Sequence, residues 1–261
     1  MALQLKAFIQ NLVDTARVAT GKWRYTSLES ILTDLNDSLA FKTSLKDKTI
    51  TCFGDSITAA NYPGANSYVT QMVNILGGMT VHNYAHASAF IVNGNSGDAG
   101  TINNLCGRVD AAITADLATD IIFVHIGSNG TYDTLAGDFN TAMAKTTQGS
   151  LDQTLIYEAY RYGIWRLTEH WPNAKVFCVV PPQQNEAWPI GKFFAQAQAI
   201  RDIAWNYNCF VIDASRELGI VQQYELPGAM GQYLQDGLHP NSAGETLMAN
   251  FYAREILKRF L

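Results

Sequence analysis

Residues 49–58 of this 261-residue chain read TITCFGDSIT, and this stretch decides the fold class. Its first five residues are apolar or β-branched, without strict alternation, which is typical of a strand that is buried on both faces. The glycine, aspartate and serine that follow form a polar turn at the carboxyl end of that strand. Doubly wound parallel sheets bind their ligands at this end of their strands. The stretch therefore predicts a central parallel strand that leads directly into a candidate functional serine, Ser56.

Further stretches of the same kind follow along the chain, at Thr80–Tyr84, Asp120–Ile126, Lys175–Val180 and Cys209–Ile212. Segments with helical periodicity lie around them, at Ser67–Leu76, Leu105–Leu117, Leu151–Glu169, Phe193–Tyr207 and Ser242–Phe260. Alternating strands and helices predict a five-stranded parallel sheet with helices on both faces and right-handed crossovers. The α/β domain that we expect covers residues 46–261.

The first 45 residues do not follow this alternation. They contain one apolar stripe at helical spacing between Leu5 and Ala16, and a second stripe that begins with the capping box TSLE at residues 26–29. We expect an N-terminal helical segment at 1–45, with two interpretations open. It is either an appendage packed on the domain, or an assembly or anchoring segment that makes a homo-oligomer, because such apolar stripes require a partner.

Composition excludes several classes of protein. Hydrophobic residues make up 48% of the chain and charged residues 16%, which excludes intrinsic disorder. Lys and Arg number 18 against 23 Asp and Glu, without a basic cluster, so neither nucleic acid nor an anionic membrane surface is an expected partner. No apolar stretch is long enough to predict a membrane span. The N-terminal residues lack the pattern of a signal peptide, so we expect a protein that is cytoplasmic as synthesised.

Two further polar stretches lie where Ser56 can meet them. Asn129, in GSNG at residues 127–130, follows the third predicted strand, and its amide can donate to a developing alkoxide. Asp236 and His239, in DGLHP at residues 236–240, precede the last helix. A carboxylate at imidazole Nδ1 orients the ring and leaves Nε2 free to take the serine proton. Each stretch alone also fits a plain turn or helix cap, but their order along the chain indicates a catalytic triad.

Together, GDSIT at 54–58, GSN at 127–129 and DGLHP at 236–240 resemble the sequence blocks of the SGNH (GDSL-like) hydrolases, an esterase family. The resemblance implies a flavodoxin-like three-layer α/β/α fold with strand order 2-1-3-4-5. It also implies Ser56 as nucleophile, His239 as base, Asp236 as the acid that orients it, and Asn129 as an oxyanion donor. No metal or nucleotide motif occurs in the sequence, so we expect no cofactor and no metal.

The sequence departs from the family pattern at two places. Ser88, in HNYAHASA at residues 82–89, stands where the family has a glycine whose backbone N–H serves the oxyanion hole. That N–H is retained if the local φ tolerates a Cβ, so Ser88 remains a candidate oxyanion donor. Gly130 stands where the family continues with an aspartate, and Asp133 lies near enough to be considered as a substitute.

The segments expected to line the pocket, 59–66 and 84–97, are small, polar and rich in Gly and Asn, and no apolar lid is evident. They favour a short acyl group, acetyl above all, on a carbohydrate or other polar carrier, which would make the protein a deacetylase. The alternative is a catalytically idle carbohydrate-binding or phage-tail protein on the same fold, associated with a virion. His86 and several aromatic residues could contact substrate, although such residues more often pack in loops and cores.

Overall fold

The structure is a computed structural model, and it describes residues 45–59, 67–93, 103–129, 135–185 and 190–260. The fold reported below is that of Asp47–Leu261, the larger of two compact units of the chain. The two N-terminal helices expected within residues 1–45 lie outside the described residues, apart from Leu45. Their existence and their role in assembly therefore stay predictions.

Five parallel strands form one sheet in the order β2-β1-β3-β4-β5. They are β1 (Thr49–Gly54), β2 (Thr80–Asn83), β3 (Ile121–His125), β4 (Lys175–Val180) and β5 (Phe210–Asp213). The predicted fold class and strand order are confirmed. The predicted strand bounds differ from these by one residue in most places, which is the usual uncertainty at the end of an element.

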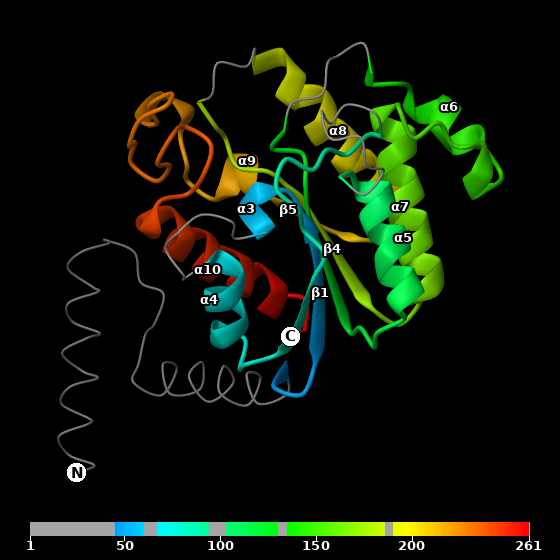
Figure 1. Cartoon of the computed structure of the whole chain (residues 1–261), viewed down its shortest axis with the longest axis horizontal. Helices are drawn as coiled ribbons and strands as arrows, with labels where there is room; N and C mark the ends of the chain where they lie inside the picture. Colours follow the sequence, from blue (N-terminus) through cyan, green and yellow to red (C-terminus); the bar gives the residue numbers. More distant parts are fainter. Residues whose placement is uncertain (1–44, 60–66, 94–102, 130–134, 186–189, 261) are drawn as a thin grey trace, which may run out of the picture. The chain divides into compact units, whose positions relative to one another are not determined.

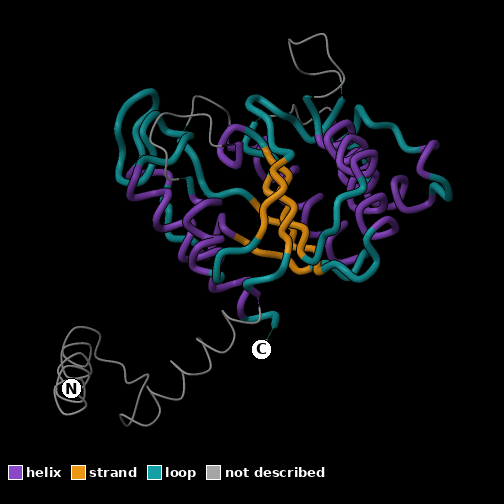
Figure 2. Tube along the Cα trace, turned by 60° about the horizontal axis from the view of Figure 1, so that its bottom comes forward, coloured by secondary structure: helices purple, strands orange, loops and turns teal. Residues whose placement is uncertain are grey.

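Helices connect the strands and cover both faces of the sheet (Figures 1 and 2). The longer ones are α4 (Tyr68–Ile75), α5 (Leu105–Ala115), α6 (Phe139–Ala144), α7 (Ile156–His170), α8 (Ile190–Asn206) and α10 (Ser242–Leu257). Short helical turns are α3 (Ser56–Ala59), η2 (Gln148–Ser150), α9 (Ala214–Glu217) and η3 (Gln222–Tyr224). None of these helices is both long enough and apolar enough to cross a membrane.

The side chains of β3 alternate between two different cores. Ile122 and Val124 pack with residues of α5, α7 and α8 in one continuous hydrophobic cluster. Phe123 and His125 point the other way, and their rings pack against aromatic rings of α4 and α10. In Figure 1, α4 and α10 lie together on one side of the sheet, and α5 and α7 lie on the other. The chain therefore forms the predicted three layers.

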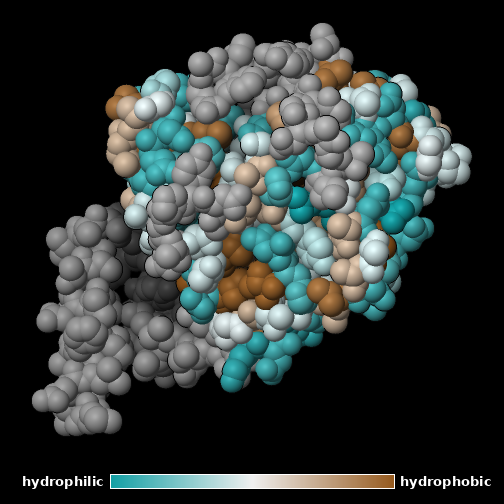
Figure 3. Space-filling view, viewed as in Figure 1, coloured by the Kyte–Doolittle hydropathy of each residue, from teal (hydrophilic) through white to brown (hydrophobic). Residues whose placement is uncertain are grey.

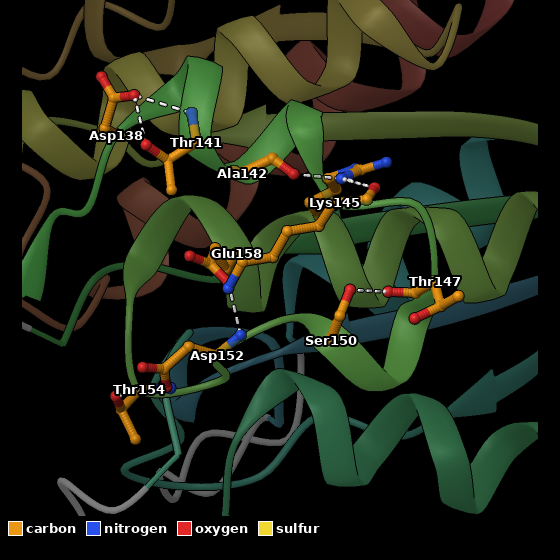
Figure 4. Close-up of polar contacts among 10 residues, drawn as sticks. Asp138, Thr141, Ala142, Lys145, Thr147, Ser150, Asp152, Thr154 and Glu158 are labelled. Atoms are coloured by element: carbon orange, nitrogen blue, oxygen red, sulfur yellow. Dashed lines mark hydrogen bonds and ion pairs between the residues drawn. The ribbon is translucent and has the colours of Figure 1, made fainter.

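The connection between α6 and α7 differs from the prediction of one helix over 151–169. The helix begins only at Ile156, because the Asp152 carboxylate accepts the N–H of Thr154 at 2.9 Å and holds the chain in a turn. The buried Glu158 carboxylate in turn accepts the Asp152 N–H and the Lys145 ammonium, each at 2.5 Å (Figure 4). These contacts attach the connection between α6 and α7 to the first turn of α7.

All four cysteines are free thiols in the structure. Three of them, Cys52, Cys106 and Cys178, are fully buried within the sheet and α5, whereas Cys209 is partly buried. Burial raises the pKa of Cys52 to about 12, so this thiol stays protonated. The buried cysteines therefore act as small apolar side chains.

Candidate active site

Ser56 lies where β1 ends and the short helix α3 begins. The turn depends on Gly54, because a Cβ at this position would lie 2.5 Å from the carbonyl oxygen of His125 on β3. Only a glycine permits this close approach of two backbones. As a result, Ser56 stands at the carboxyl edge of the sheet, immediately beside the end of β3.

Ser56, His239 and Asp236 form a continuous chain of hydrogen bonds. Ser56 Oγ lies 2.9 Å from His239 Nε2, and His239 Nδ1 lies 2.7 Å from Asp236 Oδ2. The other carboxylate oxygen of Asp236 accepts the backbone N–H groups of Leu238 at 2.9 Å and His239 at 2.7 Å. The turn therefore fixes both the carboxylate and the ring, and the spacing Asp-x-x-His brings the two side chains into contact across it.

The environment of Asp236 favours its charged form. Partial burial raises the pKa of this carboxyl, but hydrogen bonds from the His239 backbone, the His239 ring and the Leu238 backbone outweigh burial and hold the pKa below its usual value. An ionised Asp236 accepts a hydrogen bond from the N–H at Nδ1 of His239, which leaves Nε2 as the acceptor that faces Ser56. This is the tautomer that a general base requires.

Asn129 and Ser88 lie close together. The Asn129 side-chain Nδ2 donates to the carbonyl oxygen of Ala89 at 2.8 Å, which leaves its second N–H for another acceptor. Ser88 has a φ of +58°, a left-handed conformation that few residues other than glycine adopt. Within the described part of the chain, the backbone N–H groups of Ser56 and Ser88 donate to no protein acceptor. These groups can therefore receive a developing oxyanion.

Two side chains that the sequence did not single out hold the Asn129 turn. The fully buried Asp55 carboxylate accepts the N–H of Ser128 at 3.0 Å and of Ile57 at 3.2 Å, so it ties this turn to the nucleophile turn. Burial raises the pKa of Asp55, and these two hydrogen bonds oppose the rise. Gln184, beyond β4, donates to the carbonyl oxygen of Ser128 at 3.0 Å. Only the position of Asp55 beside Ser56 could have indicated its role.

The remaining candidates have ordinary surroundings or lie outside the described residues. His86 Nδ1 lies 2.7 Å from the Ala87 carbonyl oxygen, an internal contact of the loop after β2. A further carboxylate, Asp213 at the end of β5, accepts two hydrogen bonds from Arg201, at 2.9 and 2.8 Å. Gly130 and Asp133 lie outside the described residues. Among the residues that are described, no group of His, Cys, Asp and Glu side chains is arranged to hold a metal ion.

A serine that hydrogen-bonds a His–Asp pair at the carboxyl edge of a parallel α/β sheet is the arrangement found in serine acyl hydrolases. A family model for the GDSL-like lipases and acylhydrolases matches residues 52–247, from within β1 to the first turn of α10. The chain belongs to this GDSL-like lipase/acylhydrolase family, a family of ester hydrolases, as the resemblance predicted.

Solved structures of similar proteins share the fold. A protein from Lactobacillus plantarum is 20% identical with a TM-score of 0.65, over 83% of this chain and 99% of that one. A lipase/acylhydrolase from Enterococcus faecalis is 16% identical with a TM-score of 0.54, over 81% and 96%. Est24, a carbohydrate acetylesterase from Sinorhizobium meliloti, is 15% identical with a TM-score of 0.55, over 82% and 100%. No curated protein matches this chain.

Proposed function

We propose that the protein is a serine esterase that removes short acyl groups, acetyl above all, from a carbohydrate or other polar alcohol. The observation that supports this proposal is the hydrogen-bonded chain from Ser56 through His239 to Asp236. A protein that only binds carbohydrate or builds a phage tail has no need of a histidine in hydrogen-bond contact with a serine hydroxyl.

In the proposed reaction, Ser56 Oγ attacks the ester carbonyl carbon while His239 Nε2 takes the hydroxyl proton. The carbonyl oxygen becomes an oxyanion, and the N–H groups of Ser56 and Ser88 and the Asn129 amide donate hydrogen bonds to it. The alcohol leaves with the proton from His239, and the acyl group stays on Ser56. Water then attacks the acyl-enzyme with His239 again as base, and releases the carboxylic acid. Each oxyanion donor is expected to contribute roughly 10²–10³ in rate.

The acetyl specificity rests on the polar, Gly- and Asn-rich composition of segments 59–66 and 84–97, of which residues 60–66 and 94–97 lie outside the described residues. Est24, which has the same fold, is named a carbohydrate acetylesterase, so the fold is compatible with that activity. These two observations support the class of substrate, and experiments must identify the alcohol that carries the acetyl group.

Hydrolysis of p-nitrophenyl acetate tests the proposal, with the Ser56→Ala variant as its partner. The wild-type protein should release p-nitrophenol and react with a fluorophosphonate probe, and the variant should do neither. The variant loses one hydroxyl and should keep its stability within about 1 kcal/mol. Labelling of another serine in the Ser56→Ala variant would show that the nucleophile is assigned wrongly, and a wild type without any turnover would favour an idle binding protein.

A further inference from the structure

The chain between α9 and α10 carries an unusual group of exposed hydrophobic side chains. Of the seven large hydrophobic side chains exposed in the described part of the chain, four lie between Val221 and Met230. Tyr224 is 64% exposed, Leu226 52% and Met230 63%. Single exposed hydrophobic residues need no explanation, but several in one short segment indicate a binding surface. We call residues 221–234 the mouth loop.

The mouth loop has a defined conformation. The buried Glu225 carboxylate accepts the backbone N–H groups of Tyr233 at 3.0 Å and Leu234 at 2.8 Å, which fastens the loop from inside. Asn185 Nδ2 donates to the Glu225 carbonyl oxygen at 2.6 Å. Because Glu225 points inward, its two neighbours, Tyr224 and Leu226, point to the surface. The exposure of these two side chains is therefore built into the loop.

The mouth loop also rests directly on the turn that holds Asp236 and His239. Gly228 N–H donates to the Asp236 carbonyl oxygen at 2.7 Å, and Asn241 N–H donates to the Tyr233 carbonyl oxygen at 2.8 Å. The Met230 sulfur lies 3.5 Å from Asn241 Nδ2, two residues after His239. Figure 1 shows the loop, in orange, at the same edge of the sheet as α3, and Figure 3 shows hydrophobic atoms at the surface over it.

In the proposed reaction, the leaving alcohol and the carbonyl oxygen of the ester lie on different sides of the site. His239 must return its proton to the oxygen of the leaving alcohol, so that oxygen lies within hydrogen-bond reach of Nε2. The carbonyl oxygen points instead to Ser88 and Asn129, which lie on the loops after β2 and β3. The alcohol therefore extends along the His239 side, where the mouth loop stands.

From this placement we infer that Tyr224, Leu226 and Met230 form the subsite for the alcohol, and that this alcohol contains a ring with an apolar face, as a pyranose does. The flat Tyr224 ring can stack on such a face, and the thioether of Met230 and the Leu226 side chain adapt to its edge. The inference rests on the proposed function and names the part of the substrate that the sequence left open.

The test compares two acetates that share the acyl group and differ in the alcohol, methyl β-xylopyranoside triacetate and ethyl acetate. The variant Tyr224→Ser/Met230→Ser removes two of the three apolar side chains of this subsite. Leu117→Ser, at an exposed position before β3, is the matched control. For the loop variant, the ratio of kcat/KM on the pyranoside to kcat/KM on ethyl acetate should fall roughly five- to tenfold, mainly through KM. The control should leave this ratio at the wild-type value.

A ratio that stays at the wild-type value in the loop variant, with an unchanged thermal midpoint, overturns the inference. So does a change of preference between p-nitrophenyl acetate and p-nitrophenyl butyrate in the loop variant, because it would assign the loop to the acyl group. Failure of the proposed function looks different, because the wild type would then hydrolyse none of these esters.

Discussion

At the scale of single residues, a substitution of Asp236 tests how the imidazole of His239 is oriented, because it leaves the nucleophile Ser56 unchanged. In an Asp236→Asn variant the amide can donate to Nδ1 and stabilise the wrong tautomer of His239, with Nε2 protonated and unable to accept from Ser56. The equivalent Asp→Asn substitution in a serine-protease triad lowers kcat by about 10⁴, and we expect a loss of this size at neutral pH. Hydroxide can take over part of the work of the base, so we expect the loss to shrink as the pH rises towards about 10.

Rates of p-nitrophenyl acetate hydrolysis for both proteins across this pH range test the role of Asp236. Asp213→Asn is a matched control, since Asp213 binds Arg201 in the structure and should not affect the rate strongly. If Asp236→Asn retains wild-type activity within about threefold at neutral pH, Asp236 is not the orienting acid.

Ser88 provides a second prediction at this scale, because its φ of +58° strains any residue with a Cβ. Relief of the left-handed strain exceeds the entropy that a glycine loses on folding, so Ser88→Gly should stabilise the protein by about 0.5 kcal/mol. Ser88→Val should destabilise it, since a β-branched residue tolerates this conformation least. Urea unfolding gives both free energies, and a valine variant as stable as the glycine variant would contradict this account. The glycine variant should retain the esterase rate because its backbone N–H is unchanged.

The sequence predicted which side chains would meet, but not what holds them. Ser56, Asn129 and His239 each follow or adjoin an element that ends at one sheet edge, so their order along the chain was enough to bring them together. Gln184 could not be predicted, because its contact with Ser128 depends on how the chain leaves β4. The positive φ of Ser88 was indicated only by the glycine that the family has at this position, because this sequence carries a serine there.

At the scale of elements, α4, β3 and α10 meet in a cluster of aromatic rings that distinguishes two tyrosines. The hydroxyl of Tyr68 lies 2.8 Å from Thr58 Oγ1 and 2.9 Å from His125 Nδ1. The hydroxyl of Tyr252 is also buried, but it has no hydrogen-bond partner among the described residues. A buried polar group without a partner lowers the stability of the folded state, whereas the hydrogen bonds of the Tyr68 hydroxyl offset the cost of removing it from water.

The two substitutions by phenylalanine should therefore have different effects on the free energy of unfolding. We expect Tyr252→Phe to leave the free energy of unfolding unchanged or raise it by up to about 1 kcal/mol, and Tyr68→Phe to lower it by about 1–3 kcal/mol. Both variants remove one oxygen from the same cluster, so each is the control for the other in urea or thermal unfolding. Equal effects of the two variants would mean that the Tyr252 hydroxyl is satisfied, for example by a buried water molecule.

Elements with a clear period were predicted well, and those without one were not. We could predict β1, β3 and β4 from their near-continuous apolar residues, and α10 from its apolar stripe. Burial on both faces of a strand, or on one side of a helix, requires apolar residues at a regular spacing. The mouth loop has neither the strand nor the helix period. Its conformation depends on hydrogen bonds of backbone groups and of the one inward carboxylate, Glu225. The exposed hydrophobic side chains of the mouth loop were therefore not predicted, because they do not form a continuous apolar stretch in the sequence.

At the scale of the whole molecule, the buried His125 and the partly buried Glu245 make stability depend on pH in opposite directions. Burial lowers the pKa of His125 to about 3, from an ordinary value of 6.5, so the folded protein keeps this ring neutral. The unfolded chain binds a proton there first as the pH falls. The contribution of His125 to stability is therefore present above about pH 6.5 and is lost progressively towards about pH 3, which predicts a urea midpoint that decreases through this range.

Glu245 acts on the alkaline side. Burial between α10 and α4 raises the pKa of its carboxyl from 4.5 to about 7, although a hydrogen bond from the Tyr68 backbone N–H opposes the rise. The folded state therefore favours the protonated form, and this contribution to stability is present below about pH 4.5 and is lost as the pH rises through about 7. Glu245→Gln retains an acceptor for Tyr68 and carries no charge. It should unfold at a urea midpoint close to that of the wild type near pH 5 and at a clearly higher one near pH 8 or so. The exposed Glu217→Gln serves as a control that should shift the midpoint equally at both pH values, and the same behaviour in Glu245→Gln would show that Glu245 does not titrate between them.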